Sequence, residues 1–266
     1  MIDGRAIIDP TAKLGENVSV GPWSIIGPEV VIGDGVVINS HVVLKGPANI
    51  GAGVRIFQFA TVGEDTPALA YSGEKTTLEI GEGTVIREGV TIHRGMEDGG
   101  IGDTSIGKNC LLMAYVHIGH DCVVGDNVIM ANNCSLSGHV EVGDHANFGG
   151  YSGIPPFRKV GAYSHIAAMS LVLKDVPAYM TVAGNPAYAV GLNIEGMKRR
   201  EYDSKTRAAI KEAHKMVYRK GLRLGEAIES LANLRLEFPE VDIFAQSLES
   251  SSVGIIRGRG YSSSDS

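Results

Sequence analysis

An aliphatic side chain recurs at every sixth position through most of this chain, and this period restricts the possible folds more than any single residue does. A second row, four residues after each aliphatic position, holds small or β-branched side chains. Two inward positions per hexad match neither the period of about 3.6 residues of a helix nor the simple alternation of a strand. The aliphatic row consists of Ile8, Leu14, Val20, Ile26, Ile32, Ile38, Leu44, Ile50, Ile56 and Val62, then Ile80, Ile86 and Ile92, and then every sixth residue from Ile106 to Val172.

This period predicts a solenoid in which each hexad forms one short strand and its turn, and three hexads close one triangular coil. Parallel strands of successive coils would then satisfy each other's backbone groups and bury the aliphatic row. Glycines directly after the aliphatic positions, such as Gly15 and Gly33, are interpreted as corner residues with positive φ. Two interruptions, Glu64–Glu79 and His93–Ser105, are expected to be loops extruded at a corner on the functional face.

Beyond Val176 the hexads end, and after an extended connector punctuated by Pro and Gly the apolar spacing becomes helical. Three helices are expected, over Lys205–Arg219 with Ser204 as the N-cap, over about Gly225–Glu237, and near Val241–Leu248. The final SSSDS is expected to be disordered. The chain therefore divides into a β-helical domain, residues 1-190, and a helical domain, residues 191-266.

Composition excludes several classes of function. The net charge of −6 and the lack of a recognition motif argue against nucleic-acid binding, and no apolar run reaches the roughly 18 residues that an integral membrane segment needs. No secretion signal precedes the repeat, and Cys110, Cys122 and Cys134 fall at small inward positions as reduced core thiols. We therefore expect a cytoplasmic protein.

The segment Asn193–Arg223 is basic, with ten Lys and Arg against four Asp and Glu. It is either a solvated helix face or a docking surface for an acidic partner or phosphates.

Five histidines cluster in the middle and late coils, where a core would not accommodate them: His93, His117, His120, His139 and His145. Since a coil is predicted to take eighteen residues, Gly138 should lie one rung from His120, with its N–H placed to stabilise an oxyanion beside a base. Whether the adjacent Asp121 can orient the imidazole is left open by the spacing. One alternative is a set of exposed histidines that only decorate a turn. The other is a zinc site shared between subunits, as in proteins that resemble γ-class carbonic anhydrases, although the histidine spacings here differ from that pattern.

Longer motifs turn this pattern into a specific resemblance. The segments TIHRG, LLMAYVHIGHDCVVGDNVIMANNCSLSGHVEV and GLNIEGMKRR together resemble the bacterial UDP-N-acetylglucosamine acyltransferases, which act first in lipid A synthesis. The resemblance covers nearly the whole chain. It implies a mainly β fold, in which a left-handed parallel β-helix of hexapeptide repeats is followed by a small α-helical C-terminal domain. It also implies a homotrimer with active sites between subunits and no metal or other cofactor.

The resemblance further implies a reaction and the residues that perform it. A 3-hydroxyacyl chain would pass from acyl carrier protein to the 3-hydroxyl of UDP-N-acetylglucosamine, with His120 as the base, Gly138 N–H as the oxyanion donor and Asp121 as the third catalytic candidate. The positions that match the family's substrate contacts are His93, His117 and His139 around the sugar, and Asn193, Glu195, Arg199 and Arg200 around the uridine and phosphates.

The chain departs from the family pattern at several positions near the expected substrates. These are Ala68 and Ala70 in the first insertion, Pro155, Pro156 and Arg158 in a late coil, and Pro186 near the end of the acyl groove. Lys75 is interpreted as a substitute for the lysine lost from the first insertion. Two alternatives therefore stay open, an acyltransferase of the same fold that acts on a 3-amino sugar nucleotide, and a non-catalytic paralogue that binds nucleotide sugar or acyl carrier protein. The sequence does not determine the length of the acyl chain.

Overall fold

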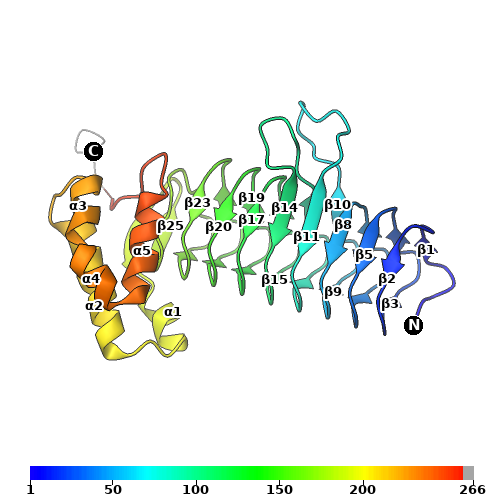
Figure 1. The fold of residues 1–266 in the computed structure, drawn as a ribbon, viewed down its shortest axis with the longest axis horizontal. Coiled ribbons are helices and arrows are strands. Elements are labelled where there is room, and N and C mark those ends of the chain that lie inside the picture. The colour runs from blue at the N-terminus through cyan, green and yellow to red at the C-terminus, as the bar shows by residue number, and fades with distance from the viewer. Residues whose placement is uncertain (260–266) are drawn as a thin grey trace.

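The hexads fold, as predicted, into a three-sided parallel β-helix, which Figure 1 shows in a computed structural model that describes residues 1–259. The segment SSSDS, predicted to be disordered, lies outside the described residues. Each regular coil takes eighteen residues, because Ile8 pairs in parallel with Ile26 and Ile26 with Leu44. The solenoid forms most of the long axis of the molecule, and the helices gather at its C-terminal end (Figure 1).

Three sheets, named here A, B and C, cover the three sides of the solenoid. Sheet B contains β1 (Ile7–Ile8), β4 (Ile25–Ile26), β7 (Val43–Leu44), β10 (Thr61–Glu64), β13 (Thr91–His93), β16 (His117–Ile118), β19 (Ser135–Leu136) and β22 (Gly153–Ile154). Sheet C contains β2 (Lys13–Leu14), β5 (Val30–Ile32), β8 (Ala48–Ile50), β11 (Thr77–Ile80), β14 (Asp103–Ile106), β17 (Val123–Val124), β20 (Glu141–Val142) and β23 (Lys159–Val160). Sheet A contains β3 (Ser19–Val20), β6 (Val37–Ile38), β9 (Arg55–Ile56), β12 (Val85–Ile86), β15 (Leu111–Leu112), β18 (Ile129–Met130), β21 (Asn147–Phe148), β24 (His165–Ile166), β25 (Met180–Gly184) and β26 (Ala187–Leu192). The chain runs from B to C to A in each coil and so passes three corners, B/C, C/A and A/B.

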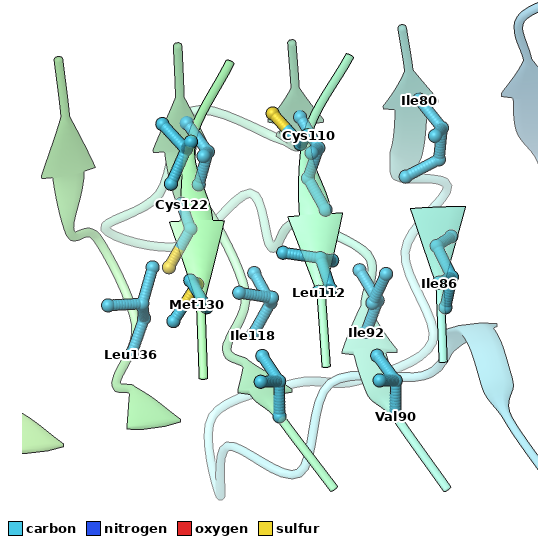
Figure 2. Close-up of a cluster of buried hydrophobic side chains, with 14 of the residues drawn as sticks. Ile80, Ile86, Val90, Ile92, Cys110, Leu112, Ile118, Cys122, Met130 and Leu136 are labelled. Carbon is cyan, nitrogen blue, oxygen red and sulfur yellow. The ribbon is translucent and has the colours of Figure 1, made fainter. Parts of the chain in front are cut away.

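The aliphatic row forms the core of the solenoid. Figure 2 shows Ile86 and Ile92 from one coil beside Leu112 and Ile118 from the next, and none of these four side chains has exposed surface. Coil stacking rather than any single coil therefore creates the core, and this is why such a repeat is stable only in series.

The three cysteines occupy the core positions predicted for them. Cys110, Cys122 and Cys134 are unpaired and buried, and Figure 2 shows the first two among the aliphatic side chains. Burial raises the pKa of the Cys110 thiol to about 11 and that of Cys122 to about 12. Thiols in this environment stay protonated at neutral pH and are poor nucleophiles.

The prediction that glycines after the aliphatic positions have positive φ is wrong for all of those positions except Gly63. Positive φ occurs two residues later in the turn, for example at Asn17 with φ 56° and at Gly35 with φ 67°. The glycines are needed because successive coils approach closely there. A Cβ on Gly33 would lie only 2.7 Å from the backbone nitrogen of Ala52 in the next coil.

Two loops leave the solenoid at corner B/C and are shorter than predicted. The first insertion covers residues 65–76 between β10 and β11, and the second covers residues 94–102 between β13 and β14. The predicted insertions were longer because β10, β11 and β14 extend beyond the two-residue strands of an ordinary hexad. Both loops project from the middle of the solenoid (Figure 1).

The helical domain contains α1 (Ile194–Arg199), α2 (Ser204–Arg219), α3 (Leu224–Ser230), α4 (Ala232–Glu237) and α5 (Pro239–Glu249). The predicted helix over Lys205–Arg219 is confirmed, but its N-cap is Asp203, whose carboxylate accepts from the Thr206 N–H at 2.7 Å. The single helix predicted over Gly225–Glu237 is instead two, which are separated at Leu231. No helix among residues 1–259 combines the length and the apolar content that crossing a bilayer requires.

The two predicted domains are tied together by the C-terminal segment. Strand β26 ends at Leu192, and α1, which begins at the end of the segment predicted to be extended, was not predicted. After α5 the chain returns to the solenoid, where Ile255 bridges Asp175 and Ile256 joins the solenoid core. Residue 190, the predicted boundary, lies within β26, and Ile256 from the end of the chain packs in the solenoid core.

Candidate active site

His120 and Asp121 form the centre of the site, at corner B/C directly after β16. The His120 Nδ1 atom lies 2.7 Å from Asp121 Oδ2. The carboxylate is completely buried and the imidazole is 16% exposed. Since a carboxylate accepts hydrogen bonds, Nδ1 carries the proton, and Nε2 is left as the basic atom of the neutral ring. Asp121 thus reaches back to the ring, a contact that the sequence left open.

Gly138 lies one coil from His120, as the eighteen-residue period predicts. A Cβ on Gly138 would lie 2.5 Å from His120 Nε2, so no residue larger than glycine fits beside this ring without a shift. Among the hydrogen bonds of the described residues, none uses the Gly138 N–H, while the neighbouring His139 N–H donates to His120 O at 2.9 Å. The Gly138 N–H is therefore available beside the basic nitrogen.

The other predicted sugar-binding histidines lie around this pair. The His139 ring meets His120 edge-on, with centroids 4.8 Å apart, and stacks on Phe157 at 4.3 Å. His117 contacts Thr91 Oγ1 at 2.9 Å, and His93 Nδ1 lies 2.8 Å from Asp65 O. Burial lowers the pKa of His117, with smaller effects from neighbouring imidazoles, and burial likewise lowers the pKa of His139. Neutral imidazoles near pH 7 suit hydrogen bonding to an uncharged sugar.

We call His93, His117, His120, Asp121, Gly138 and His139 the histidine corner. His120, Asp121 and His139 offer donor atoms within 4.8 Å of one another. They do not fit a metal ion, because the Asp121 oxygens already accept from His120 and from three backbone N–H groups, and His120 Nδ1 faces the carboxylate. The zinc alternative therefore has no support in this geometry.

The remaining predicted site residues belong to α1 and its two caps, Asn193–Arg200, which we call the α1 segment. Asn193 caps the helix by accepting from the Gly196 N–H at 2.9 Å. Glu195 pairs with Lys198 at 2.8 Å on the surface. The Arg200 guanidinium lies 5.5 Å from the centre of the Tyr163 ring at corner C/A.

The histidine corner and the α1 segment lie at different corners of the solenoid. His93 and His117 are on sheet B and the rest of the histidine corner is at corner B/C, whereas Tyr163 fixes the α1 segment to corner C/A. The charge of Arg199 contributes to a lowered pKa of His165 on sheet A, behind the effect of burial. Within residues 1–259 no hydrogen bond, ion pair or ring contact joins the two groups. One chain therefore does not assemble all of the predicted site.

The structure shows the contacts and the burial of several residues at or near the positions that depart from the family pattern. Lys75 pairs with Glu29 at 2.8 Å, which directs its charge to the second coil and away from the histidines. Arg158 is half-buried, and its Nη1 atom is buried without a hydrogen-bond partner. Phe157, which lies between these departures and itself matches the family pattern, is exposed apart from its stacking on His139.

One anchor of the site was not predicted. Arg94 directly follows His93, its side chain is 7% exposed, and it donates to Gly63 O and Asp65 Oδ1 in the first insertion. The sequence signal was available, since an Arg directly follows the strand that carries His93.

The three-sided parallel β-helix, with a histidine and a carboxylate at one corner, agrees with the bacterial transferase hexapeptide class, whose repeat matches two parts of the chain. The hexapeptide-repeat model matches residues 11–46 and 103–138, and the model for domain 2 of UDP N-acetylglucosamine O-acyltransferase matches residues 175–256. The acyl-[acyl-carrier-protein]–UDP-N-acetylglucosamine O-acyltransferase of Stutzerimonas stutzeri is 53% identical over 97% of this chain and 99% of its own length.

Solved structures agree. LpxA from Acinetobacter baumannii is 47% identical, with a TM-score of 0.94 over 96% of this chain and 99% of the other. The Arabidopsis UDP-N-acetylglucosamine acyltransferase is 31% identical, with a TM-score of 0.85 over 97% of this chain and all (100%) of the other. The chain therefore belongs to the UDP-N-acetylglucosamine O-acyltransferase family, and the predicted left-handed parallel β-helix is confirmed.

Proposed function

We propose that this protein transfers a 3-hydroxyacyl chain from acyl carrier protein to the 3-hydroxyl of UDP-N-acetylglucosamine, the first step of lipid A synthesis. Family membership at 53% identity over nearly the whole chain supports the reaction. The observation that carries the mechanism is the His120 ring, held by Asp121 at 2.7 Å and placed directly beside the Gly138 backbone.

The proposed step begins when His120 Nε2 takes the proton of the sugar 3-hydroxyl while that oxygen attacks the thioester carbonyl. General base catalysis of this kind is typically worth about 10²–10⁴-fold. The Gly138 N–H donates to the oxyanion that forms, a contribution of roughly 3–4 kcal/mol in comparable sites. As the carbonyl re-forms, the carbon–sulfur bond breaks and the imidazolium returns its proton to the departing thiolate. Asp121 stabilises the transient imidazolium.

We propose that the acceptor lies across sheet B, with His93, His117 and His139 around the sugar. The α1 segment would hold the uridine and phosphates, because guanidinium groups such as those of Arg199 and Arg200 match phosphate oxygens in geometry and charge. The three unpaired, buried cysteines suit the reducing cytoplasm, where we place the reaction.

We also propose that the site is completed in a homotrimer. If sheet B of one copy faces sheet A of the next, the partner's α1 segment lies opposite the histidine corner, and corner A/B lies at the three-fold axis. Corner A/B carries an exposed apolar row that such packing would bury. The row consists of Trp23, Phe59, Tyr115, Tyr151 and Met169.

The basic surface of α2 is the proposed docking surface for the acyl carrier protein. Lys205, Lys211 and Lys215 are exposed, and only Lys215 has an acidic partner among the described residues, Glu212 at 3.1 Å. Exposed, mostly unneutralised cations would steer an acidic carrier to the end of the solenoid that holds the α1 segment.

Intact-mass spectrometry tests the function. The purified protein would be mixed with acyl carrier protein loaded with 3-hydroxyacyl chains of several lengths and with UDP-N-acetylglucosamine. We expect loss of the acyl mass from the carrier and its gain on the sugar nucleotide. Transfer only to the 3-amino analogue would contradict the proposed acceptor, and no transfer to either acceptor would contradict catalysis.

A further inference from the structure

The second insertion, residues 94–102, ends on the same carboxylate that holds the proposed base. Asp121 Oδ1 accepts from Ile101 N–H at 2.8 Å and from Gly102 N–H at 3.0 Å, and Oδ2 accepts from Met96 N–H at 3.1 Å. The carboxylate is completely buried, so these backbone groups take the place of water around its charge. Three of the contacts that fix Asp121 thus come from the loop and not from the solenoid.

The solenoid fixes the backbone of Asp121 by a different contact. The Asp121 N–H donates to Thr104 Oγ1 at 2.8 Å, at the start of the strand that follows the loop. Besides its contacts with the loop, the Asp121 carboxylate contacts His120 Nδ1 through Oδ2 at 2.7 Å. Because one carboxylate binds both the loop and the imidazole, a shift of the loop must change the direction or the strength of the contact to His120.

The loop is closely packed where it meets the carboxylate. A Cβ on Gly100 would lie 2.5 Å from Asp121 Oδ1 and 2.2 Å from Met96 O, whereas nothing lies within 4 Å of the Cβ position of the adjacent Gly99. Met96 itself is buried, and its carbonyl accepts from Gly102 N–H at 3.0 Å, which closes the loop on itself. Gly100 is therefore required by its surroundings, and Gly99 only by its φ of 73°.

The loop is also joined to the first insertion. Arg94 donates to Gly63 O and Asp65 Oδ1 and contacts Tyr71 Oη at 3.3 Å. Glu97 N–H donates to Glu74 Oε1 at 3.3 Å. The second insertion is thus held from both sides, by the first insertion and by the buried carboxylate.

We propose that the second insertion is a positioning element for the His120 base, and that Gly100 is a positioning residue within it. The backbone N–H groups of the loop hold the Asp121 carboxylate in the direction that keeps the His120 proton on Nδ1 and aims Nε2 at the acceptor hydroxyl. The inference rests on the proposed acyl transfer for its kinetic test, and on geometry alone for its spectroscopic test.

Gly100→Ala is the test variant, and Gly99→Asn is its matched control, since Asn tolerates positive φ and this position is open. We expect Gly100→Ala to lower kcat by about 10- to 100-fold, as for a small misplacement of a catalytic group, with the KM for the sugar nucleotide nearly unchanged. The His120 Nδ1–H proton resonance should shift or broaden. Gly99→Asn should leave both measurements as in the wild type.

Met96→Ala provides a second variant if Gly100→Ala does not fold, because it removes the buried anchor of the loop without adding atoms. Met96→Ala should also lower kcat and shift or broaden the His120 Nδ1–H resonance, with KM for the sugar nucleotide nearly unchanged, but both changes should be smaller than for Gly100→Ala. Wild-type kcat together with an unshifted His120 resonance in a folded variant would overturn the inference. An inactive wild-type protein would instead contradict the proposed function, while the resonance would still report whether the loop positions the imidazole.

Discussion

The histidine corner and the α1 segment are built in opposite ways. At the histidine corner the side chains are buried or half-buried, and the His120 ring is fixed by a fully buried carboxylate at 2.7 Å. In the α1 segment, Glu195 and Lys198 are exposed and pair with each other, and Arg200 rests on the face of a ring. Rigid placement suits proton transfer, and long exposed cations suit capture of a charged substrate. The difference predicts that mutations in the two regions change different kinetic constants.

The largest expected effect comes from removing the proposed base, His120. His120→Ala should lower kcat by at least about 10²-fold with little change in the affinity for the sugar nucleotide, because a base acts mainly in the transition state. Steady-state kinetics and calorimetric binding would measure the two quantities. A variant with near-normal kcat would remove His120 from the mechanism.

The α1 segment should show the reverse pattern. Arg199→Ala should weaken sugar-nucleotide binding by about 1.5–3 kcal/mol through loss of a charge-assisted hydrogen bond, while kcat at saturation stays close to the wild type. Lys198→Ala is the control on the same helix, since that side chain already pairs with Glu195. Equal losses in the two variants would mean that the segment acts only through its net charge.

Acid should destabilise both regions. Burial is the main cause of the lowered pKa of His117 and His139 in the histidine corner, and of His145 and His165 beside the α1 segment. A depressed histidine pKa means that the folded state favours the neutral ring. Stability from these groups is therefore complete above a pH of about 6.5, the unfolded value, and is lost as the pH falls below it. Thermal unfolding between pH 7.5 and 5.5 should show a falling midpoint, and a flat or rising midpoint would contradict this account.

The smallest effect is expected for the basic surface of α2, the proposed docking surface for the carrier protein. Reversing Lys205, Lys211 and Lys215 to Glu should leave sugar-nucleotide affinity intact and lower kcat/KM for the acyl carrier by about 10-fold at low salt, with a smaller loss as salt screens the field. The measurement is kcat/KM for the carrier at several ionic strengths. An unchanged value at low ionic strength would mean that the three lysines form an ordinary solvated face.

The two regions also differ in how far the sequence predicts them. The eighteen-residue coil placed Gly138 beside His120, because a stacked repeat converts sequence spacing directly into distance. Residues 94–102 have no repeat, so their contacts with Asp121 could not be predicted. The α1 helix was missed because Pro and Gly dominate the preceding segment, and its start depends on the Asn193 cap. Corner glycines were misassigned because close approach between coils and positive φ select the same residue.

The central claim is that the histidine corner of one copy works with the α1 segment of another. The test uses His120→Ala and the double variant of Arg199→Ala and Arg200→Ala, which should turn over little substrate when the sugar nucleotide is far below saturation. The two proteins would be unfolded together, refolded as a mixture and assayed at that concentration against each protein refolded alone. If the site is shared between copies in a trimer, random mixing at equal concentration should restore about one quarter of the sites. No recovery in oligomers shown by native mass spectrometry to be mixed would contradict the claim, and would place the whole site within one chain.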